Sequence, residues 1–360
     1  MLQSTCKIPA LPPAENLETV PILKMLVRAN RALAELKGRA SSIPNQGILI
    51  DTLSLQEAKA SSEIENIVTT QDELFQADLF PEGPRSPTAK EVALYRRAIK
   101  IGFDRVREDQ GLIANRTLTT LYQTLKVRSD GFRATPGTAL LNETTGERVY
   151  VPPQERPEIV SHMSELEKFV NVDEICDLDP LIKMALIHHQ FESIHPFADG
   201  NGRVGRILNV LYLTKTGLLD IPILYLSRYV THTKGDYYRL LQTVRDEDVW
   251  EDWILYMLAG VEETAQHALT LVEEIRTQMA SEKRRMRDRL PKLYSQDLLN
   301  NLFRHPYTRV EFAVKDLGVT RQTAAKHLDK LADKGFVTKR SSGKHNYYVN
   351  DDLVELFVVG

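Results

Sequence analysis

The chain has 360 residues, with 46 basic and 49 acidic side chains, a formal net charge of −3, and 42% hydrophobic residues. This composition predicts two or three globular domains, and it excludes wholesale disorder and a protein coated in nucleic acid, although a local basic patch remains compatible with it. The two cysteines, Cys6 and Cys176, exclude a disulfide framework and indicate a reducing compartment. The sequence shows neither a signal peptide nor a run of about 18 apolar residues, so we expect a cytoplasmic protein without a membrane span.

The N-terminal half of the chain is predicted to be helical. Apolar residues at three- and four-residue spacing predict a helix over Val20–Lys37, which ends before Gly38. A second helix is expected over residues 54–69, with Ser54 as its N-cap. After the proline-rich loop PEGPRSP, further helices are expected at Thr88–Arg107, Asn115–Leu125 and Arg156–Val170. Residues 131–153 combine turn residues with the β-favouring run RVYV and predict a β-hairpin.

A glycine-rich turn separates two apolar helices between residues 180 and 216. The run LIKMALIHHQFESI forms the first helix, and GRVGRILNVLYLTKTG begins the second. Two more helices are expected, in TKGDYYRLLQTVRDED and in the long run over residues 249–290. The charged C-terminal half of that run is typical of a solvated connector to a separate domain.

Residues 291–360 predict a winged helix-turn-helix, because three helical runs precede two strands around a tight turn. This segment carries 11 basic and 8 acidic side chains, so its net charge is +3 while the remainder is −6. The recognition helix would be VTRQTAAKHLDKLADKGF. Candidate DNA contacts on this helix and the wing are Arg321, Gln322, Thr323, Lys326, Lys339, Arg340 and Lys344. The modest charge leaves a protein-binding or dimerising winged helix equally open.

The segment IHPFADGNGRVGR, at residues 194–206, concentrates several kinds of chemistry. Residues 200–202 (GNG) can turn successive N–H groups toward one anion at the start of a helix. Arg203 and Arg206 can bind phosphate oxygens, and Asp199 can hold a Mg²⁺ ion that bridges phosphates. His195 can accept a proton near pH 7. A plain turn with surface arginines is the alternative, but the combination favours a polyphosphate site, with Phe197 assigned to the core.

This segment also resembles a known signature. HPFADGNGRVGR matches the Fic family signature H-x-F-x-D/E-G-N-G-R-x-x-R at every defined position, and the resemblance covers roughly residues 10–260. It implies a mainly α fold, with an all-helical Fic core and a β-hairpin flap, followed by the small α/β winged helix-turn-helix domain. It also implies AMPylation, the transfer of AMP from ATP to a hydroxyl of a target protein with release of pyrophosphate.

The resemblance assigns roles to individual residues. His195 would deprotonate the target hydroxyl, and Asp199 would hold Mg²⁺ between the α- and β-phosphates of ATP. Gly200, Asn201 and Gly202 would cradle the phosphates, with Arg203 on the β/γ side and Arg206 on the γ-phosphate. The intact GNG matters, since family members that transfer other groups commonly depart from this signature.

The stretch SSEIEN resembles the inhibitory signature S/T-x-x-x-E-G/N of the same family. In this sequence the signature falls on Ser61, Glu65 and Asn66. The resemblance implies that Glu65 pairs with Arg206 and keeps that guanidinium from the γ-phosphate. Taken alone, a serine and a glutamate four residues apart on a helix are usually a solvated face.

Two further sets of residues are candidates with weaker signals. The residue 131–153 hairpin resembles the family's flap, in which Tyr150 and Val151 would contact the target segment by main-chain pairing; a plain surface hairpin is the alternative. Tyr237 and Tyr238 are candidates for the adenosine, but adjacent side chains on a helix diverge, so at most one is expected there. The histidines outside the motif are assigned no catalytic or metal role, namely His188, His189, His305, His327 and His345.

The leading interpretation is a protein adenylyltransferase of four parts: an N-terminal helical region (1–95), a catalytic core (96–260), a helical connector (261–290) and the winged helix (291–360). Its expected partners are ATP, Mg²⁺ and a hydroxyl-bearing target protein, with self-modification and a homodimer also open and no membrane. One alternative is a DNA-binding regulator whose Fic core is a sensor. A second is removal of AMP from modified proteins, with Glu65 activating water.

Overall fold

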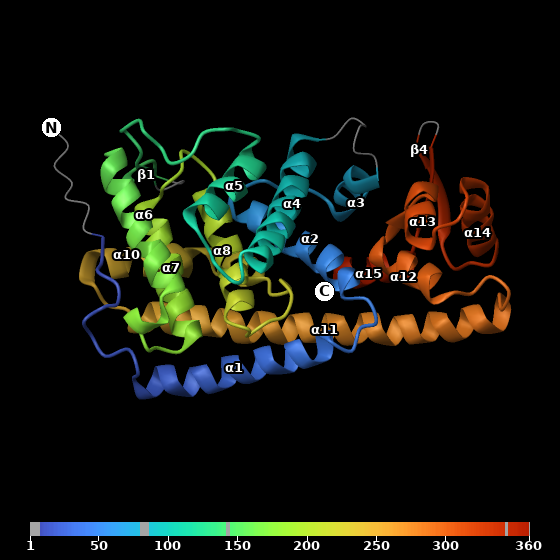
Figure 1. Cartoon of the computed structure of the whole chain (residues 1–360), viewed down its shortest axis with the longest axis horizontal. Coiled ribbons are helices and arrows are strands. Elements are labelled where there is room, and N and C mark those ends of the chain that lie inside the picture. The colour runs from blue at the N-terminus through green and yellow to red at the C-terminus, as the bar shows by residue number, and fades with distance from the viewer. Residues whose placement is uncertain (1–7, 80–85, 142–144, 343–344, 360) are drawn as a thin grey trace.

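The computed structural model describes residues 8–79, 86–141, 145–342 and 345–359. Helices dominate, and the sheets are small and antiparallel, which confirms the predicted fold class. In Figure 1 the long helix α11 (Glu251–Arg289) runs horizontally through the lower part of the molecule, with most of the other helices above it and the winged helix near its right-hand end. Cys6, Lys344 and most of the predicted PEGPRSP loop lie outside the described residues. In the part of the chain described, no helix is long and apolar enough to cross a membrane.

Helix α1 (Val20–Ala40) packs along α11 and confirms the predicted first helix, although it continues through Gly38. At 39 residues, α11 is about 58 Å long. The sequence predicted a solvated connector for its C-terminal half. That half is only partly solvated, because Ile275, Met279 and Met286 are buried on one face. The predicted boundaries at 95/96 and 260/261 fall inside helices α4 and α11.

The second helix, α2 (Gln46–Ile64), begins eight residues earlier than predicted. Its N-cap is Asn45, whose side chain accepts a hydrogen bond from the backbone N–H of Gly47 at 2.9 Å. Ser54 lies inside the helix, where its hydroxyl donates to the carbonyl of Ile50. The apolar residues before Ser54 therefore belong to α2. Ser54 is not the N-cap, because its hydroxyl bonds to a carbonyl of the preceding helical turn. The helix also ends before the predicted Thr69, and α3 (Gln71–Leu79) was not predicted.

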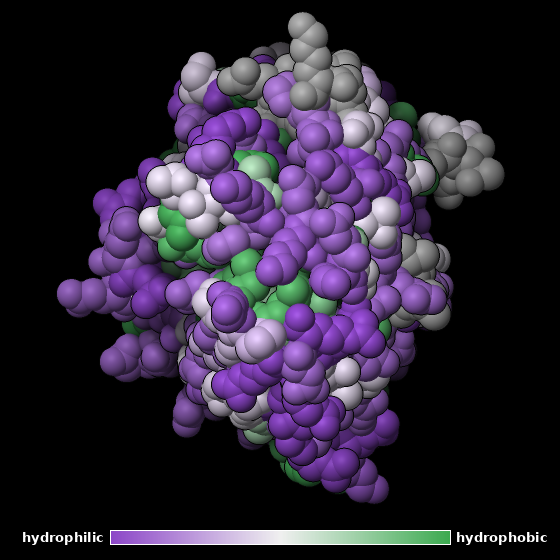
Figure 2. Space-filling view, turned by 90° about the vertical axis from the view of Figure 1, so that its right-hand side faces the viewer, coloured by the Kyte–Doolittle hydropathy of each residue, from purple (hydrophilic) through white to green (hydrophobic). Residues whose placement is uncertain are grey.

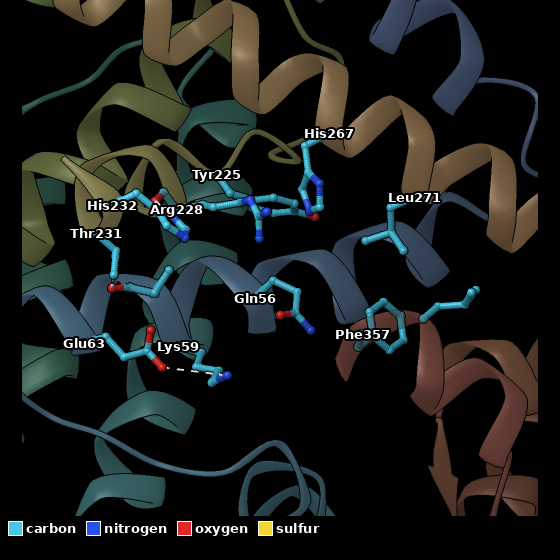
Figure 3. A pocket seen from close by; sticks show the side chains of 12 residues that line it. Gln56, Lys59, Glu63, Tyr225, Arg228, Thr231, His232, His267, Leu271 and Phe357 are labelled. Atoms are coloured by element: carbon cyan, nitrogen blue, oxygen red, sulfur yellow. Dashed lines mark hydrogen bonds and ion pairs between the residues drawn. The ribbon is translucent and has the colours of Figure 1, made fainter. Parts of the chain in front are cut away.

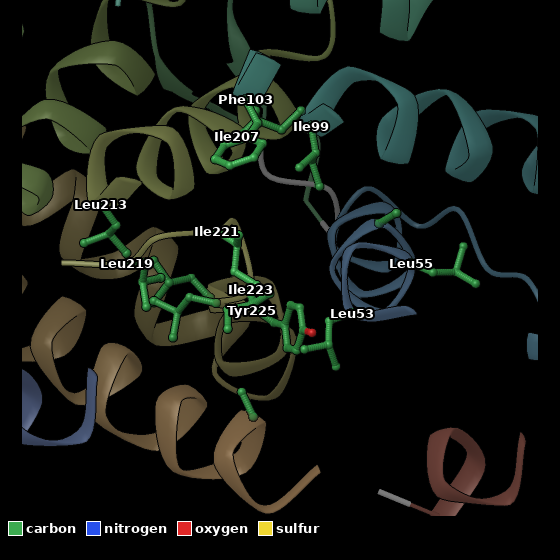
Figure 4. Packing of buried hydrophobic residues seen from close by; sticks show 14 of the residues in the cluster. Leu53, Leu55, Ile99, Phe103, Ile207, Leu213, Leu219, Ile221, Ile223 and Tyr225 are labelled. Carbon is green, nitrogen blue, oxygen red and sulfur yellow. The ribbon is translucent and has the colours of Figure 1, made fainter. Parts of the chain in front are cut away.

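The core helices surround α7 and α8, whose side chains are almost all buried. Figure 4 shows apolar side chains from α2, α4 and α8 meeting those of the segment before α9, so the helix after the glycine-rich turn is held on several sides. The helices predicted here are confirmed within a few residues, and the short helix α9 was not predicted. The bounds are α4 Pro87–Glu108, α5 Asn115–Lys126, α6 Arg156–Asn171, α7 Pro180–Ile194, α8 Asn201–Lys215, α9 Leu226–His232 and α10 Lys234–Glu247, with a short 3₁₀ helix at Asp173–Ile175.

The predicted hairpin is present as two short antiparallel strands. Strand β1 (Leu140–Leu141) pairs with β2 (Arg148–Tyr150), with Leu140 opposite Tyr150. Residues 142–144, between the strands, lie outside the described part of the chain. The strands are too short to be stable alone, so their position depends on contacts with the core.

The C-terminal part has the predicted winged-helix layout and two additional elements, β3 and α15. Its sheet has the order β3-β5-β4. It is anchored to the N-terminal helices: Arg304 pairs with Asp51 of α2 at 2.6 Å, and Tyr307 donates to Asp72 of α3 at 2.5 Å. Figure 2 shows this end of the molecule as mostly hydrophilic, with hydrophobic side chains gathered in a small central area. The bounds are α12 Gln296–Arg304, β3 Tyr307–Thr308, α13 Val310–Leu317, α14 Arg321–Asp333, β4 Thr338–Ser342, β5 His345–Val349 and α15 Asp351–Val359.

Candidate active site

Two left-handed residues shape the turn between α7 and α8. His195 ends α7 with φ 49°, and Gly200 precedes α8 with φ 76°, a conformation that glycine adopts without strain. Phe197 lies between these two residues. The side chain of Asn201, the first residue of α8, accepts a hydrogen bond from the N–H of Phe197 and donates one to its carbonyl, both at 2.8 Å. Phe197 is buried, as predicted, and stacks on Tyr122 with ring centroids 4.4 Å apart. The amide of Asn201 therefore holds the turn closed, which leaves its backbone rather than its side chain for a phosphate.

A cavity of about 910 Å³ opens above this turn. It brings together residues that are far apart in sequence: the turn, Glu65 at the end of α2, the hairpin and α10. Among the predicted site residues, the lining includes His195, Asp199, Gly200, Asn201, Gly202, Arg206, Tyr237, Tyr238 and Glu65. The volume lies in the range of small-molecule sites, so the cavity has room for a nucleotide.

His195 carries a neutral imidazole in this site. Burial lowers its pKa to about 3, and the positive charges of Arg245 and Arg133 act in the same direction. Its Nδ1 atom is buried and has no hydrogen-bond partner among the described residues. The ring is thus unprotonated at neutral pH and has a nitrogen without a protein partner, so it can accept a proton, although its lowered pKa makes it a weaker base than a free imidazole.

Two arginines that the sequence analysis did not single out hold His195 in place. Arg133 donates from Nε to the carbonyl of His195 at 2.8 Å. Its Nη2 atom donates to the carbonyl of Pro153 at the base of the hairpin. Arg245 donates to the Ser193 hydroxyl at 3.0 Å and lies 4.0 Å above the ring of Tyr150. Both therefore connect the hairpin to the end of α7.

Asp199 and Arg203 belong to one charged cluster. The Asp199 carboxylate lies 2.6 Å from Lys126 Nζ, and Arg203 pairs with Glu91 of α4, which also lies 3.4 Å from Lys126. Burial opposes ionisation of Asp199, but the hydrogen bond from Lys126 and the charges of Lys126 and Arg203 lower its pKa overall. Arg203 is buried against Glu91 and does not line the cavity, whereas the resemblance implied a phosphate contact. Neither Glu91 nor Lys126 had a signal in the motif.

Asp199 is a suitable single ligand for Mg²⁺. Its carboxylate is ionised and 60% exposed on the cavity side of the turn. The described residues contain no group of three His, Cys, Asp or Glu side chains that could hold a metal ion. A metal here would therefore take most of its ligands from phosphates and water, as Mg²⁺ commonly does.

Arg206 is buried and bound by the end of α2. Its Nη2 atom donates to Glu65 Oε1 at 3.0 Å and to the Ser61 carbonyl at 3.0 Å, and its Nε atom donates to the Ser61 hydroxyl at 2.8 Å. Burial opposes the charge of Arg206, but Glu65 and other neighbours raise its pKa overall. A Cβ atom on Gly202 would lie 2.7 Å from Glu65 Oε1, so the carboxylate rests on the GNG turn.

Asn66 has a backbone role at the end of α2. It adopts a left-handed conformation with φ 60°, which asparagine and glycine tolerate better than other residues. This turn ends the helix directly after Glu65. The Asn or Gly at this position of the inhibitory signature thus has a steric reason.

The two tyrosines of α10 differ as predicted for adjacent residues. Tyr237 is buried, and its hydroxyl lies 2.8 Å from His188 Nε2, while Tyr238 is 47% exposed. His188 and His189 are both buried and hydrogen-bonded, and burial lowers the pKa of each, which fits the structural role predicted for them. A contact of either tyrosine with adenosine stays a prediction.

The two residues of the hairpin that were predicted to bind the target, Tyr150 and Val151, both lie outside the lining of the cavity. The Tyr150 side chain points inward and donates to the Ser193 carbonyl at 2.9 Å, so only its backbone remains available for pairing with a target. Val151 is half-buried and does not line the cavity. The hairpin residues that face the cavity include Leu140, Leu141 and Val149, and the last two are exposed.

On the winged helix, the candidate DNA contacts mostly lie at the surface. Gln322 and Lys326 are exposed and Thr323 is half-buried. Three of the basic side chains are paired within the domain: Arg321 with Glu311, Lys339 with Asp329 and Arg340 with Asp351. These pairs reduce the positive charge offered to a phosphate backbone, and DNA binding stays a prediction.

A buried carboxyl next to Arg206 predicts a pH-dependent stability. Glu57 accepts hydrogen bonds from Tyr95 at 2.9 Å and from Ser227, and burial raises its pKa to about 7. The unfolded chain ionises this group from about pH 4.5, so the free energy of unfolding should fall as pH rises from 4.5 to 7, by on the order of 3 kcal/mol. Glu57→Gln should reduce this decline in urea titrations at several pH values, and part of it should remain because burial also raises the pKa of Glu192 to about 7. The exposed Glu18→Gln should keep it, and equal slopes in both variants would contradict the assignment.

The fold and cavity define a predominantly helical protein in which a glycine-rich turn between two buried helices lines a nucleotide-sized cavity. Family models agree with this class: "Fic/DOC family N-terminal" matches residues 23–104, "Fic/DOC family" residues 112–213, and "Protein adenylyltransferase SoFic-like, C-terminal domain" residues 278–353. The chain belongs to the Fic family.

Curated relatives match the chain over short segments. A probable protein adenylyltransferase of Aquifex aeolicus (strain VF5), aq_aa38, is 44% identical over 54 residues, which cover 15% of this chain and 17% of the relative. The protein adenylyltransferase Fic of Drosophila erecta is 31% identical over 87 residues, which cover 24% of this chain and 16% of the relative. The matches thus span about a sixth of the length of these relatives.

Solved structures share the fold. A Fic family protein from Desulfovibrio desulfuricans G20 aligns with a TM-score of 0.58 and 18% identity, over 94% of this chain and 98% of that one. Fic-1 of C. elegans (residues 134–508) aligns with a TM-score of 0.53 and 16% identity, over 70% of this chain and 74% of that one. The first alignment includes nearly the whole chain, and at these identities it shows the fold alone.

Proposed function

We propose that this protein is an adenylyltransferase that transfers AMP from ATP to a hydroxyl side chain of a target protein. The observation that carries the proposal is that His195, Asp199, the GNG turn and Arg206 line one cavity, while Glu65 occupies Arg206. Relatives named protein adenylyltransferase support the same reaction.

In the proposed reaction, the target hydroxyl oxygen attacks the α-phosphorus of ATP. The bond from the α-phosphorus to the bridging oxygen breaks, pyrophosphate leaves, and the hydroxyl proton passes to the neutral His195 imidazole. Backbone N–H groups at the start of α8 and the guanidinium of Arg206 would hold phosphate oxygens. Asp199 would hold Mg²⁺, which neutralises phosphate charge when bound. Positioning and charge neutralisation carry most of such a transfer.

The same geometry supports a brake. While Nη2 of Arg206 donates to Glu65 and Ser61, that nitrogen cannot also donate to a γ-phosphate. Glu65 additionally places a negative charge on the GNG turn, where phosphates would lie. The wild-type protein is therefore proposed to be weakly active until α2 shifts or Glu65 is removed.

The test compares ATP labelled at two positions. The Glu65→Gly protein is incubated with Mg²⁺, cell lysate and ATP carrying the label on either the α- or the γ-phosphate. AMP transfer predicts that, above the level in lysate without the variant, only the α-label enters protein, and mass spectrometry should find an AMP adduct on Ser, Thr or Tyr. Incorporation of the γ-label would indicate phosphate transfer, and labelling with neither would count against both reactions.

A further inference from the structure

A second pocket, of about 110 Å³, lies beside α2 (Figure 3). Its walls come from α2, the chain around α9, α11 and the C-terminal helix α15. Polar groups from α2 and α9 face apolar side chains from the other two helices, among them Leu271 and Phe357. This pocket shares no lining residue with the catalytic cavity.

The pocket and the brake use opposite faces of the same helical turns. Gln56, Lys59 and Glu63 follow the i, i+3, i+7 spacing of one helix face, whereas Ser61 and Glu65 form another. At about 100° per residue, the two faces are centred about 180° apart around α2. A ligand in this pocket would therefore contact the back of the helix whose front holds Arg206.

Two polar groups in the pocket lack a protein partner. The hydroxyl of Tyr225 and the amide nitrogen of Gln56 are buried and have no hydrogen bond within the described part of the chain. Tyr225 is only 2% exposed. Buried polar groups are nearly always hydrogen-bonded, so two unsatisfied donors in one small pocket point to an absent acceptor.

The charges around the pocket favour an anion. Lys59 and Arg228 carry positive charge, and His232 and His267 contribute imidazoles, against the single carboxylate of Glu63. Glu63 lies 3.7 Å from Lys59 and offsets part of its charge. Burial lowers the pKa of His267, and the charge of Arg228 lowers it further, which shows that the positive field of Arg228 reaches this space.

We propose that this pocket binds a small oxyanion, meaning a phosphate or carboxylate group, with Tyr225 and Gln56 as hydrogen-bond donors and Arg228 and Lys59 as the charges. Its volume of about 110 Å³, against about 910 Å³ for the catalytic cavity, suits such a small group better than a whole nucleotide. The proposal does not depend on AMP transfer.

The test measures thermal unfolding of the full chain in phosphate, acetate and chloride at equal ionic strength. A ligand that binds only the folded state raises the unfolding temperature in proportion to its affinity. The matched variants are Tyr225→Phe and Gln56→Leu, each of which removes one unpartnered donor. Without an oxyanion, Tyr225→Phe should unfold at the wild-type temperature or above it, because the lost hydroxyl has no partner in the empty pocket.

The expected result is a rise in the wild-type unfolding temperature with phosphate or acetate that chloride does not give. Calorimetric titration should show at least tenfold weaker binding of the same anion in at least one pocket variant. Phosphate also stabilises folded proteins without a specific site, so the rise that counts is the part lost in the pocket variants. A variant-sensitive rise with phosphate alone would identify a phosphate site, and one with acetate alone a carboxylate site. No rise in the wild type would overturn the proposal, and so would an unchanged rise in both variants, since the anion would then bind elsewhere, for instance at the GNG turn.

Discussion

Replacing Glu65 with glycine should raise AMP incorporation about tenfold to a hundredfold. The change frees Nη2 of Arg206, now held at 3.0 Å, and removes a carboxylate that rests against Gly202. One charge-assisted hydrogen bond to the γ-phosphate contributes about 1.5–3 kcal/mol, and about 1.4 kcal/mol corresponds to a tenfold change. Initial rates of α-labelled ATP incorporation, with the purified wild type and variant at equal concentration, measure the effect.

The same substitution should make the empty protein less stable. Arg206 keeps its two contacts with Ser61, but its buried charge loses the carboxylate that compensates it. Since the Glu65 side chain is 29% exposed, the free energy of unfolding should fall by about 1–3 kcal/mol, at the lower end for buried pairs. Saturating ATP should restore part of this loss, because its phosphates replace the missing charge. Activity and stability are thus expected to move in opposite directions.

Two control variants separate the brake from a general loosening of α2. Glu65→Gln keeps the size of the side chain and removes its charge, so it should release the enzyme less than glycine does. Val68→Gly changes an exposed residue just beyond the helix and should leave incorporation unchanged. Equal incorporation by the wild type and Glu65→Gly would show that the ion pair is no brake, and activation by Val68→Gly would attribute the effect to chain flexibility.

Features encoded in one continuous stretch could be predicted from the sequence. The motif at residues 194–206 places a proton acceptor, a carboxylate and an anion-binding turn within a few residues, and the structure brings these to one cavity. The pairing of Glu65 with Arg206 was expected only from the family resemblance, since 141 residues separate them. Spacing within α2 alone would have assigned Glu65 to a solvated face.

Features that depend on distant partners could not be predicted. Glu91, Lys126 and Arg133 are ordinary charged residues in their local sequence, and only the fold places them beside Asp199, Arg203 and His195. The start of α2 was missed for a different reason: serine is a frequent N-cap, and tertiary burial of the preceding apolar run outweighed that local preference. Arg203 shows a further limit, because its pairing with Glu91 depends on how α4 packs.

Replacing His195 with asparagine should abolish most of the AMP transfer while leaving nucleotide binding nearly intact. General-base catalysis contributes about 10²–10⁴ in rate, so the Glu65→Gly, His195→Asn double variant should lose that factor relative to Glu65→Gly. Asparagine is preferable to alanine, because residue 195 has φ 49° and asparagine tolerates this left-handed conformation better. Alanine would add backbone strain to the loss of the base.

Several measurements test whether His195 is the base. The dissociation constant for ATP should change less than about threefold, since phosphate binding rests on the GNG turn and Arg206. The unfolding temperature of the double variant should match that of Glu65→Gly, and His162→Ala on α6, outside the cavity, should keep full activity. Because burial lowers the pKa of His195 to about 3, the imidazole is neutral across pH 6–8, so protonation of this ring should cause no loss of rate at pH 6. Transfer within about threefold of the Glu65→Gly rate would remove His195 from the role of base and assign the proton to water or to the phosphates themselves.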